Sequence, residues 1–112
     1  MSATPGRRFY EEQLRYLSAG DVDGLVANHY AEDGAIISFD FTVKGRPALR
    51  KHFQSYLEML GYIKLLSTDR FTETDDAIFF EATVETRQGV VRVYAAFVLK
   101  DGKITHHFTG VK

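Results

Sequence analysis

Turn signals at regular spacing divide the second half of the chain, and they constrain the fold more than any other feature. From Tyr62 onward, segments rich in β-branched and aromatic residues are separated at Asp75-Asp76, Gln88-Gly89 and Asp101-Gly102. Asp-Gly is a strong signal for a two-residue hairpin, because both central positions require a positive φ. We therefore expect four antiparallel strands joined by short turns, the first of them spanning residues 62–74.

Two-residue loops determine which side chains of these strands share a face. At Gln88-Gly89 such a loop places Glu85 opposite Arg92 and Phe80 opposite Phe97. A shift by one residue would mix apolar and charged side chains, which a half-buried sheet resists. The same rule at the other turns predicts one largely apolar face, with His106 and Asp69 as its titratable members and with Ile78, Phe80, Ala82, Val84, Val93, Ala95, Phe97, Leu99, Ile104 and Phe108 as the rest.

The first half of the chain is predicted to be mainly helical, because apolar residues recur there at helical spacing in three segments. The signals that bound these segments are Thr4-Pro5 and Gly20 for the first, Asp21 for the beginning of the second, and Gly45-Arg46-Pro47 and Gly61 for the third. A strand at 35–41 and a short partner at 42–44 are expected between the second and third helices. Three helices must cover the apolar face of the sheet, which predicts a two-layer α+β domain.

Size and composition exclude several classes of protein. A chain of 112 residues corresponds to one domain, residues 1–112, and its net charge of −1 lacks the broad positive field of proteins that bind nucleic acids or acidic membranes. The absence of cysteine excludes disulfides and thiolate catalysis. No apolar run approaches the roughly 20 residues of a membrane helix, so we expect a soluble, cytoplasmic protein. Neither a phosphate-binding loop nor metal-ligand spacing is present, and no cofactor or metal is predicted.

Four segments spread over the chain from about Phe9 to Gly110 carry a resemblance to a known superfamily. They are Ala19-Gly20-Asp21-Val22-Asp23, Tyr30-Ala31-Glu32-Asp33-Gly34-Ala35, Lys44-Gly45-Arg46-Pro47-Ala48-Leu49 and Lys100-Asp101-Gly102-Lys103-Ile104. With the order of elements, they resemble the SnoaL-like proteins of the nuclear transport factor 2-like (ketosteroid isomerase-like) superfamily. The resemblance implies a strongly curved antiparallel sheet, cone-shaped like a cystatin roll, with three N-terminal helices packed on it and a pocket inside. Members include isomerases, polyketide cyclases, epoxide hydrolases, dehydratases and non-enzymatic binding proteins, so the fold alone does not decide the activity.

The resemblance also locates the positions that a ketosteroid isomerase uses. That pattern has a carboxylate base on the first strand, a tyrosine on the first helix and a protonated aspartate on the penultimate strand. The corresponding positions here hold Ser38, Gln13 and approximately Ala95, with Tyr16 one turn from Gln13. Because losing one oxyanion donor costs on the order of 10² to 10³ in rate, steroid isomerisation by that mechanism is not expected. Gln13 could still orient a ligand oxygen.

Two titratable residues are the candidate catalytic groups. Asp40 follows Ser38 by two residues, on the same face of the predicted strand, where an apolar surrounding would raise its pKa and make it a base near neutral pH. The alternative is a solvated aspartate at a strand end. His106 is predicted among Phe97 and Phe108, where a neutral imidazole could accept a proton. The alternative is a core histidine with one hydrogen-bond partner.

The other predicted site residues surround these two. Ala82 and Ala95 are small where a filled core would use larger side chains, which leaves space for a ligand. Asp69 could orient the imidazole of His106 or lie in water at a strand edge. The predicted ligand contacts are Gln13, Tyr16, Ser38, Asp69, Ala82, Ala95, Phe97 and Phe108. The remaining histidines are interpreted as a core residue (His29), a solvent-facing residue (His52) and an interface or surface residue (His107).

Two functions stay open at this point. One is an enzyme that uses acid–base chemistry on a small, apolar, oxygenated molecule, as a cyclase, isomerase, dehydratase or hydrolase does. The other is a non-catalytic module of the same fold that binds a small ligand or dimerises. A homodimer is expected because the outer face of the predicted sheet carries Tyr94, Ala96 and Val98, and because many SnoaL-like proteins are homodimers.

Overall fold

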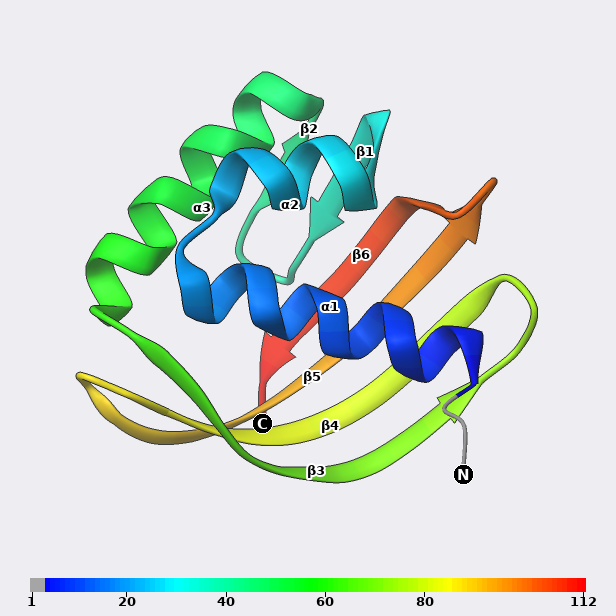
Figure 1. Ribbon diagram of the computed structural model, residues 1–112. Coiled ribbons are helices and arrows are strands. Elements are labelled where there is room, and N and C mark those ends of the chain that lie inside the picture. Colours follow the sequence, from blue (N-terminus) through cyan, green and yellow to red (C-terminus); the bar gives the residue numbers. More distant parts are fainter. Residues whose placement is uncertain (1–3) are drawn as a thin grey trace.

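A computed structural model describes residues 4–112 of the chain (Figure 1). Within this range the chain forms three helices and one six-stranded sheet. In chain order the elements are α1 (Pro5–Ala19), α2 (Val22–His29), β1 (Tyr30–Ile37), β2 (Thr42–Lys44), α3 (Arg46–Leu60), β3 (Ile63–Glu73), β4 (Ala77–Thr86), β5 (Gly89–Lys100) and β6 (Lys103–Val111). The predicted order of elements is confirmed, although β1 begins earlier and ends earlier than the expected strand at 35–41.

The first helix begins and ends at the predicted capping residues, and the second begins at its predicted cap. The side chain of Thr4 accepts a hydrogen bond from the Arg7 N–H at 3.2 Å, and Gly20 closes α1 in a left-handed conformation with φ 70°. The Asp21 side chain accepts a hydrogen bond from the Gly24 N–H at 3.0 Å and so caps α2. Because α2 begins directly after α1 ends, the two helices pack against each other.

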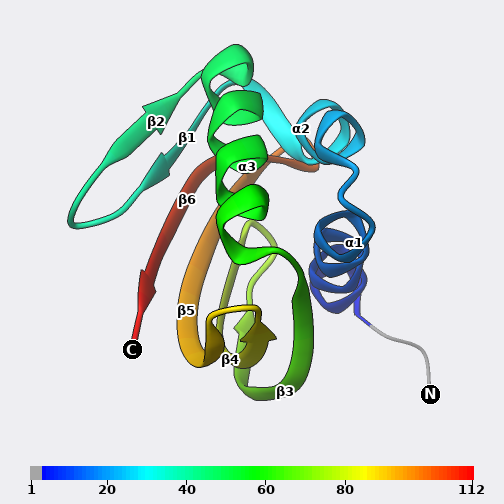
Figure 2. The same cartoon turned by 90° about the vertical axis from the view of Figure 1, so that its left-hand side faces the viewer.

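The sheet curves strongly beneath the helices (Figures 1 and 2). Its strand order is β2-β1-β6-β5-β4-β3, and neighbouring strands are antiparallel except β1 and β6, which run parallel. The predicted architecture of three N-terminal helices on a curved sheet is confirmed, and the parallel pair is an addition that the strand pattern did not indicate. None of the described helices is long and apolar enough to cross a membrane.

The hydrophobic core lies between the helices and the concave face of the sheet. Full burial of a large apolar side chain contributes about 1.5–3 kcal/mol, so a cluster drawn from every helix fixes all three on the sheet. Its buried members include Tyr10, Val22, Leu25, Val26, Leu49, Phe53, Ile78, Phe80, Ala82, Ala95 and Phe97.

The register between β4 and β5 differs from the predicted one without changing the faces. The loop consists of Arg87 and Gln88, so Phe80 pairs with Ala95, whereas a loop at Gln88-Gly89 would have paired it with Phe97. The predicted pairs are therefore wrong by two residues. Because side chains alternate with a period of two, each residue of these strands stays on its predicted face.

A bulge in β6 has a larger consequence, because it exchanges the two faces of that strand. Leu99 pairs with Ile104 as predicted, but the next pair is Val98 with His106, which leaves Thr105 as an extra residue. From the bulge onward, each side chain of β6 faces the side opposite to the prediction. The predicted inward position of His106 is wrong.

Candidate functional site

A cavity of about 580 Å³ lies between α1, α3 and the concave face of the sheet. Drug-sized ligands occupy pockets of about 300–1,000 Å³, so the cavity is large enough for one. Most side chains lining it are aromatic or aliphatic, and none of the described lining residues is a lysine or arginine. The polar side chains among them are those of Gln13, Ser38, Asp40, His52, Ser55, Tyr56 and Thr109, together with Tyr10, Tyr94 and His107.

His107 is a buried imidazole that lines this cavity. The bulge turns its side chain to the concave face, where it is 9% exposed and packs against Phe97 with ring centroids 4.7 Å apart. Its Nδ1 is 2.8 Å from the hydroxyl oxygen of Tyr30. Burial, assisted by the nearby His52, lowers the pKa of His107 to about 3, so the imidazole is neutral at any ordinary pH.

The second ring nitrogen of His107 is free to meet a ligand. Nε2 has no hydrogen-bond partner within the described chain, yet no buried side-chain nitrogen or oxygen there is left without one. Nε2 is therefore accessible, and His107 lines the cavity. A neutral imidazole held at Nδ1 and open at Nε2 can accept a proton from a bound molecule or donate a hydrogen bond to it, depending on its tautomer.

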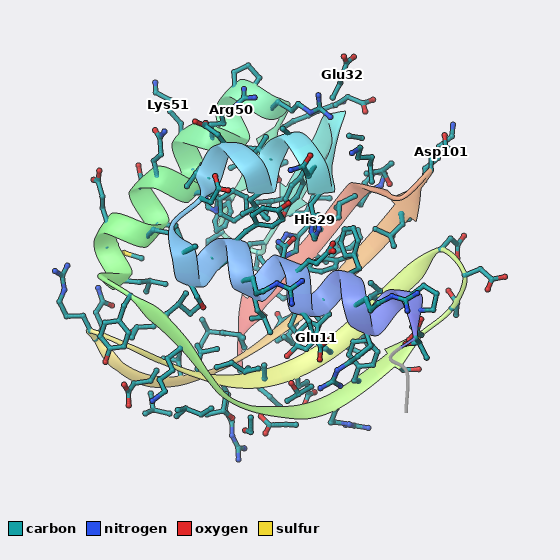
Figure 3. All side chains as sticks on the ribbon, in the orientation of Figure 1. Glu11, His29, Glu32, Arg50, Lys51 and Asp101 are labelled. Carbon is teal, nitrogen blue, oxygen red and sulfur yellow. The ribbon has the colours of Figure 1, made fainter. Side chains whose placement is uncertain are left out.

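A chain of hydrogen bonds continues from His107 to the protein surface. Tyr30 also accepts from the side-chain amide of Gln13 at 3.1 Å, and the amide oxygen of Gln13 is 2.8 Å from Nδ1 of His29. Nε2 of His29 is 3.2 Å from the carboxylate of Glu12, which is half exposed. Figure 3 shows His29 between α1 and α2, and the hydrogen bonds therefore join residues of both helices.

His52 is a second imidazole at the cavity, and its predicted position in solvent is wrong. It is half-buried on α3, where its ring is stacked on Tyr56 with centroids 5.9 Å apart and lies 5.1 Å from the ring of Phe41. Burial lowers the pKa of His52. The two imidazoles thus reach the same cavity from opposite layers of the fold.

Several residues predicted for the site line the cavity together: Gln13, Ser38, Asp40, Ala82, Ala95 and Phe97. Asp40 differs from its prediction in setting, because β1 ends before it and the residue is exposed in the loop that leads to β2. A backbone hydrogen bond of 2.8 Å from the Ser38 N–H to the Phe41 carbonyl closes this loop. Asp40 is therefore at the cavity mouth rather than in an apolar interior.

Three predicted site residues face the convex side or the surface instead. His106 and Phe108 both follow the bulge and lie on the convex face, where Phe108 is 43% exposed. Asp69 is exposed at a second irregularity, between Thr68 and Arg70, and accepts hydrogen bonds from Ser67 and Thr83 that lower its pKa. The predicted inward positions of His106, Phe108 and Asp69 are wrong.

Tyr16 also lies away from the cavity. Its hydroxyl accepts a hydrogen bond from the Asn28 side chain at 3.0 Å, and its ring meets that of His29 edge-on. Tyr16 therefore connects α1 to α2, and it is not among the described residues that line the cavity.

One pair of residues carries the signal that could have located His107 from the sequence. A glycine inside a strand is weak unless a neighbouring side chain covers it, and an aromatic ring opposite it does so. In the structure Tyr94 pairs with Gly110 and its ring lies over that glycine, where an added Cβ would be 2.3 Å from the tyrosine hydroxyl. Placing Tyr94 opposite Gly110 in the sequence moves the pairing by one residue and turns His107 inward.

Within residues 4–112, no group of three or more histidine, aspartate or glutamate side chains is arranged to hold a metal ion. The described site presents a neutral imidazole with one free nitrogen, a second imidazole, hydroxyl groups and a carboxylate at the mouth.

Comparison with solved structures defines the class of fold. A nuclear transport factor 2-like protein of Anabaena variabilis superposes with a TM-score of 0.82 at 18% identity, covering 100% of this chain and 93% of that one. A candidate polyketide cyclase of Sinorhizobium meliloti gives 0.79 at 18% identity, over 92% of this chain and 94% of that one. TerC, crystallised with polyporic acid, gives 0.78 at 16% identity, over 97% and 92%. At these identities the likeness establishes the nuclear transport factor 2-like fold.

The family follows from the sequence itself. The SnoaL-like domain profile matches residues 7–107, nearly the whole chain. The protein belongs to the SnoaL-like family, as the capping and turn segments indicated. No curated protein matches the chain.

Proposed function

We propose that this protein is an enzyme that moves a proton on a small, uncharged, oxygenated molecule in the cavity, with His107 as the acid–base group. The observation that carries the proposal is the free Nε2 of a buried, neutral imidazole in a cavity of ligand size. Cyclisation, isomerisation and dehydration all require such a transfer. The likeness to a candidate polyketide cyclase supports this class of chemistry, and the likeness to TerC, which was crystallised with polyporic acid, supports a small-molecule ligand.

The low pKa of His107 restricts the kind of substrate. The neutral form is available at all pH values above about 3, but a base of low pKa gives little driving force for removing a weakly acidic proton. A proton made acidic by neighbouring carbonyl groups suits such a base. Negative charge that develops on the substrate beside the new imidazolium would also offset the cost of charging a buried ring.

The lining supports an uncharged, apolar ligand with one or two oxygen atoms. Because no described lining residue is a lysine or arginine, a phosphate or carboxylate would find no cation there. Ala82, Ala95 and Phe97 would contact the apolar part of the ligand, and His52 and Ser38 would meet its oxygen atoms. We propose that Asp40 contacts the ligand at the mouth of the cavity, because it lines the cavity and its side chain is exposed to solvent.

The test uses 1-phenylbutane-1,3-dione, an uncharged aromatic diketone whose central C–H is acidified by two carbonyl groups. Its hydrogen–deuterium exchange in heavy water is followed by NMR with and without the protein. We expect His107→Ala to reduce the protein-catalysed exchange by about 10²-fold or more. His106→Ala is the matched control, since the neighbouring side chain faces the convex side, and it should leave the exchange unchanged.

The outcomes separate the two functions that the sequence left open. Exchange that is lost in His107→Ala, retained in His106→Ala and level from about pH 7 to pH 8 supports the enzyme, because His107 stays neutral over that range. Binding of the diketone without exchange would contradict the enzyme and favour the non-catalytic binding module. Equal exchange in wild type and His107→Ala would contradict the role of His107.

We also propose that the protein forms a homodimer through the convex face. Phe79, Ala96 and Phe108 occupy one row across β4, β5 and β6, and Val98 and His106 occupy the next. Phe79 and Phe108 are about half exposed, so the row presents apolar surface that a second copy would bury.

A further inference from the structure

The hydroxyl group of Tyr30 has one hydrogen and two neighbours that compete for it. These neighbours are the side-chain amide of Gln13 and Nδ1 of His107, at 3.1 and 2.8 Å. If the hydrogen is donated to His107, Nδ1 must be unprotonated and the ring proton is on Nε2, facing the cavity. If the hydrogen is donated to Gln13, His107 donates from Nδ1 and its Nε2 presents a lone pair. The direction of this one bond decides whether His107 is a donor or an acceptor toward a ligand.

When the amide nitrogen of Gln13 faces Tyr30, Gln13 donates to Tyr30, and Tyr30 donates its own hydrogen to Nδ1 of His107. This arrangement also fixes the charge of His29. The amide oxygen of Gln13 can only accept, and it is 2.8 Å from Nδ1 of His29. The carboxylate of Glu12 can also only accept, and it is 3.2 Å from Nε2 of the same ring. His29 must then donate from both nitrogens, which only the imidazolium does. This arrangement gives His107 a proton on Nε2.

When both contacts of His29 are kept as hydrogen bonds, a neutral ring requires the opposite direction. Its single N–H then donates to the carboxylate of Glu12, and its Nδ1 becomes an acceptor. The amide of Gln13, which has nearly the same shape after a half turn, offers its nitrogen to His29 and its oxygen to Tyr30. Tyr30 donates to that oxygen and accepts from Nδ1 of His107. Each of these hydrogen bonds then joins one donor to one acceptor, and Nε2 of His107 is an acceptor in the cavity.

The surroundings of His29 favour the neutral ring near neutral pH. Its ring is 3% exposed and stacked on Phe9, and burial, which outweighs the opposing effect of Glu12, lowers its pKa. The charged and titratable groups that face it are Glu12 and Tyr16 on α1 and Lys103 at the beginning of β6, and Lys103 lowers the pKa further. Those that face His107 are Tyr30 on β1 and His52 on α3.

We propose that Glu12, His29, Gln13 and Tyr30 are positioning residues that set the tautomer of His107, so that one proton added to His29 turns Nε2 of His107 from an acceptor into a donor. The protons balance: His29 takes one from solvent, and His107 releases its Nδ1 proton to water and takes one at Nε2 from water in the cavity, so its charge does not change. The amide of Gln13 turns over, and the hydrogen of Tyr30 turns from Gln13 to Nδ1 of His107. The inference rests on the proposed function for its consequence, since it makes the base form of His107 the one present near neutral pH. The tautomer itself exists with or without turnover.

The test is therefore spectroscopic and needs no substrate. In protein labelled with ¹⁵N-histidine, long-range ¹H–¹⁵N spectra distinguish protonated from unprotonated ring nitrogens of each histidine. From about pH 8 to about pH 4.5, a range that brackets the ordinary histidine pKa, both His29 and His107 are followed in the same sample. We expect the Nδ1–H form of His107 at the upper end. As His29 becomes protonated, the ratio of the two His107 tautomers should change by about tenfold or more, because the wrong tautomer leaves a buried group unsatisfied.

Two variants and one control identify the route. Gln13→Glu places an acceptor on both sides, so Tyr30 must donate to it and His107 should keep Nδ1–H at both ends of the range. Tyr30→Phe removes the hydrogen bond between Tyr30 and Nδ1 of His107, so the tautomer ratio of His107 should no longer follow the protonation of His29. Glu11→Gln is the matched control. Glu11 is exposed on the same helix, and it pairs with Arg7, which takes no part in the hydrogen bonds that lead to His107. It should behave as wild type, and amide spectra establish that each variant is folded.

The failures are distinguishable. Nε2–H on His107 at about pH 8, or protonation of His29 with no change in His107, would overturn the inference whatever the diketone exchange shows. The expected tautomers together with unchanged exchange in His107→Ala would uphold the inference and contradict the proposed function instead.

Discussion

The concave and convex faces of β4, β5 and β6 are built from the same strands, yet they differ in burial and in chemistry. On the concave face Phe97 is 1% exposed and His107 is 9% exposed, and the cavity lies against them. On the convex face Phe108 is 43% exposed, beside His106. Adjacent residues of one strand thus acquire opposite roles, because a single extra residue at Thr105 decides which face each one takes.

Truncating one aromatic side chain on each face should produce the largest difference between the two faces. Phe97→Ala should reduce the free energy of unfolding by about 3–5 kcal/mol, since it empties a filled part of the core. Phe108→Ala should change the monomer's stability by less than about 1 kcal/mol, because its side chain keeps much of its contact with water. Urea denaturation of both variants checks this. Equal losses would mean that the two faces are not distinct.

Acid should weaken the fold through His107. Its pKa is about 3 in the folded protein against an ordinary 6.5, so the stability that the neutral ring provides is complete above about pH 6.5 and falls as the pH drops toward 3. Between pH 7 and pH 5 the loss from this residue is about 2 kcal/mol. The free energy of unfolding, measured by denaturation at several pH values, should depend less on pH in His107→Gln over that range. In His106→Gln it should depend on pH as it does in wild type. Identical slopes in wild type and His107→Gln would contradict the burial of a neutral ring.

The proposed homodimer tests the convex face directly. At micromolar concentration we expect light scattering to give twice the chain mass of 12.7 kDa. Phe108→Glu places a charge in the proposed interface and should weaken the dimer about tenfold or more, since an unpaired buried charge is costly. Phe39→Glu is the matched control, because that phenylalanine is 94% exposed at the cavity mouth. A monomeric wild type would contradict the proposal.

The smallest effect is expected for a substitution at the mouth of the cavity. Asp40→Asn changes an exposed carboxylate in the loop between β1 and β2, so stability should stay within about 0.5 kcal/mol and the affinity for the diketone should change by less than about threefold. Calorimetry measures the affinity. A loss of exchange as large as that expected for His107→Ala would return the catalytic role to Asp40.

Local signals in the sequence predict the fold well, because each one acts within a few residues. Thr4, Gly20 and Asp21 begin or end helices where the capping rules place them. The alternation along β4 and β5 keeps side chains on their predicted faces even though the loop at Arg87 and Gln88 shifts the pairing by two. An error of an even number of residues is therefore harmless to the site.

The site was harder to predict, because one residue of register reverses a face. Counting from Asp101-Gly102 places His106 inside, and only the bulge at Thr105 corrects this. Local alternation contains no sign of that bulge, whereas the match of Tyr94 to Gly110 across two strands does. His52 was missed for a different reason: the curvature of the sheet leaves a cavity under α3, and the helical pattern alone cannot indicate which half-buried position faces it.

The central claim is that His107, and not His106, meets the ligand. The most direct measurement follows the ring signals of both histidines by NMR while 1-phenylbutane-1,3-dione is added. We predict that the signals of His107 shift in a saturable way, while those of His106 stay unchanged because that ring lies on the convex face. A saturable shift of His106 with no shift of His107 would contradict the account.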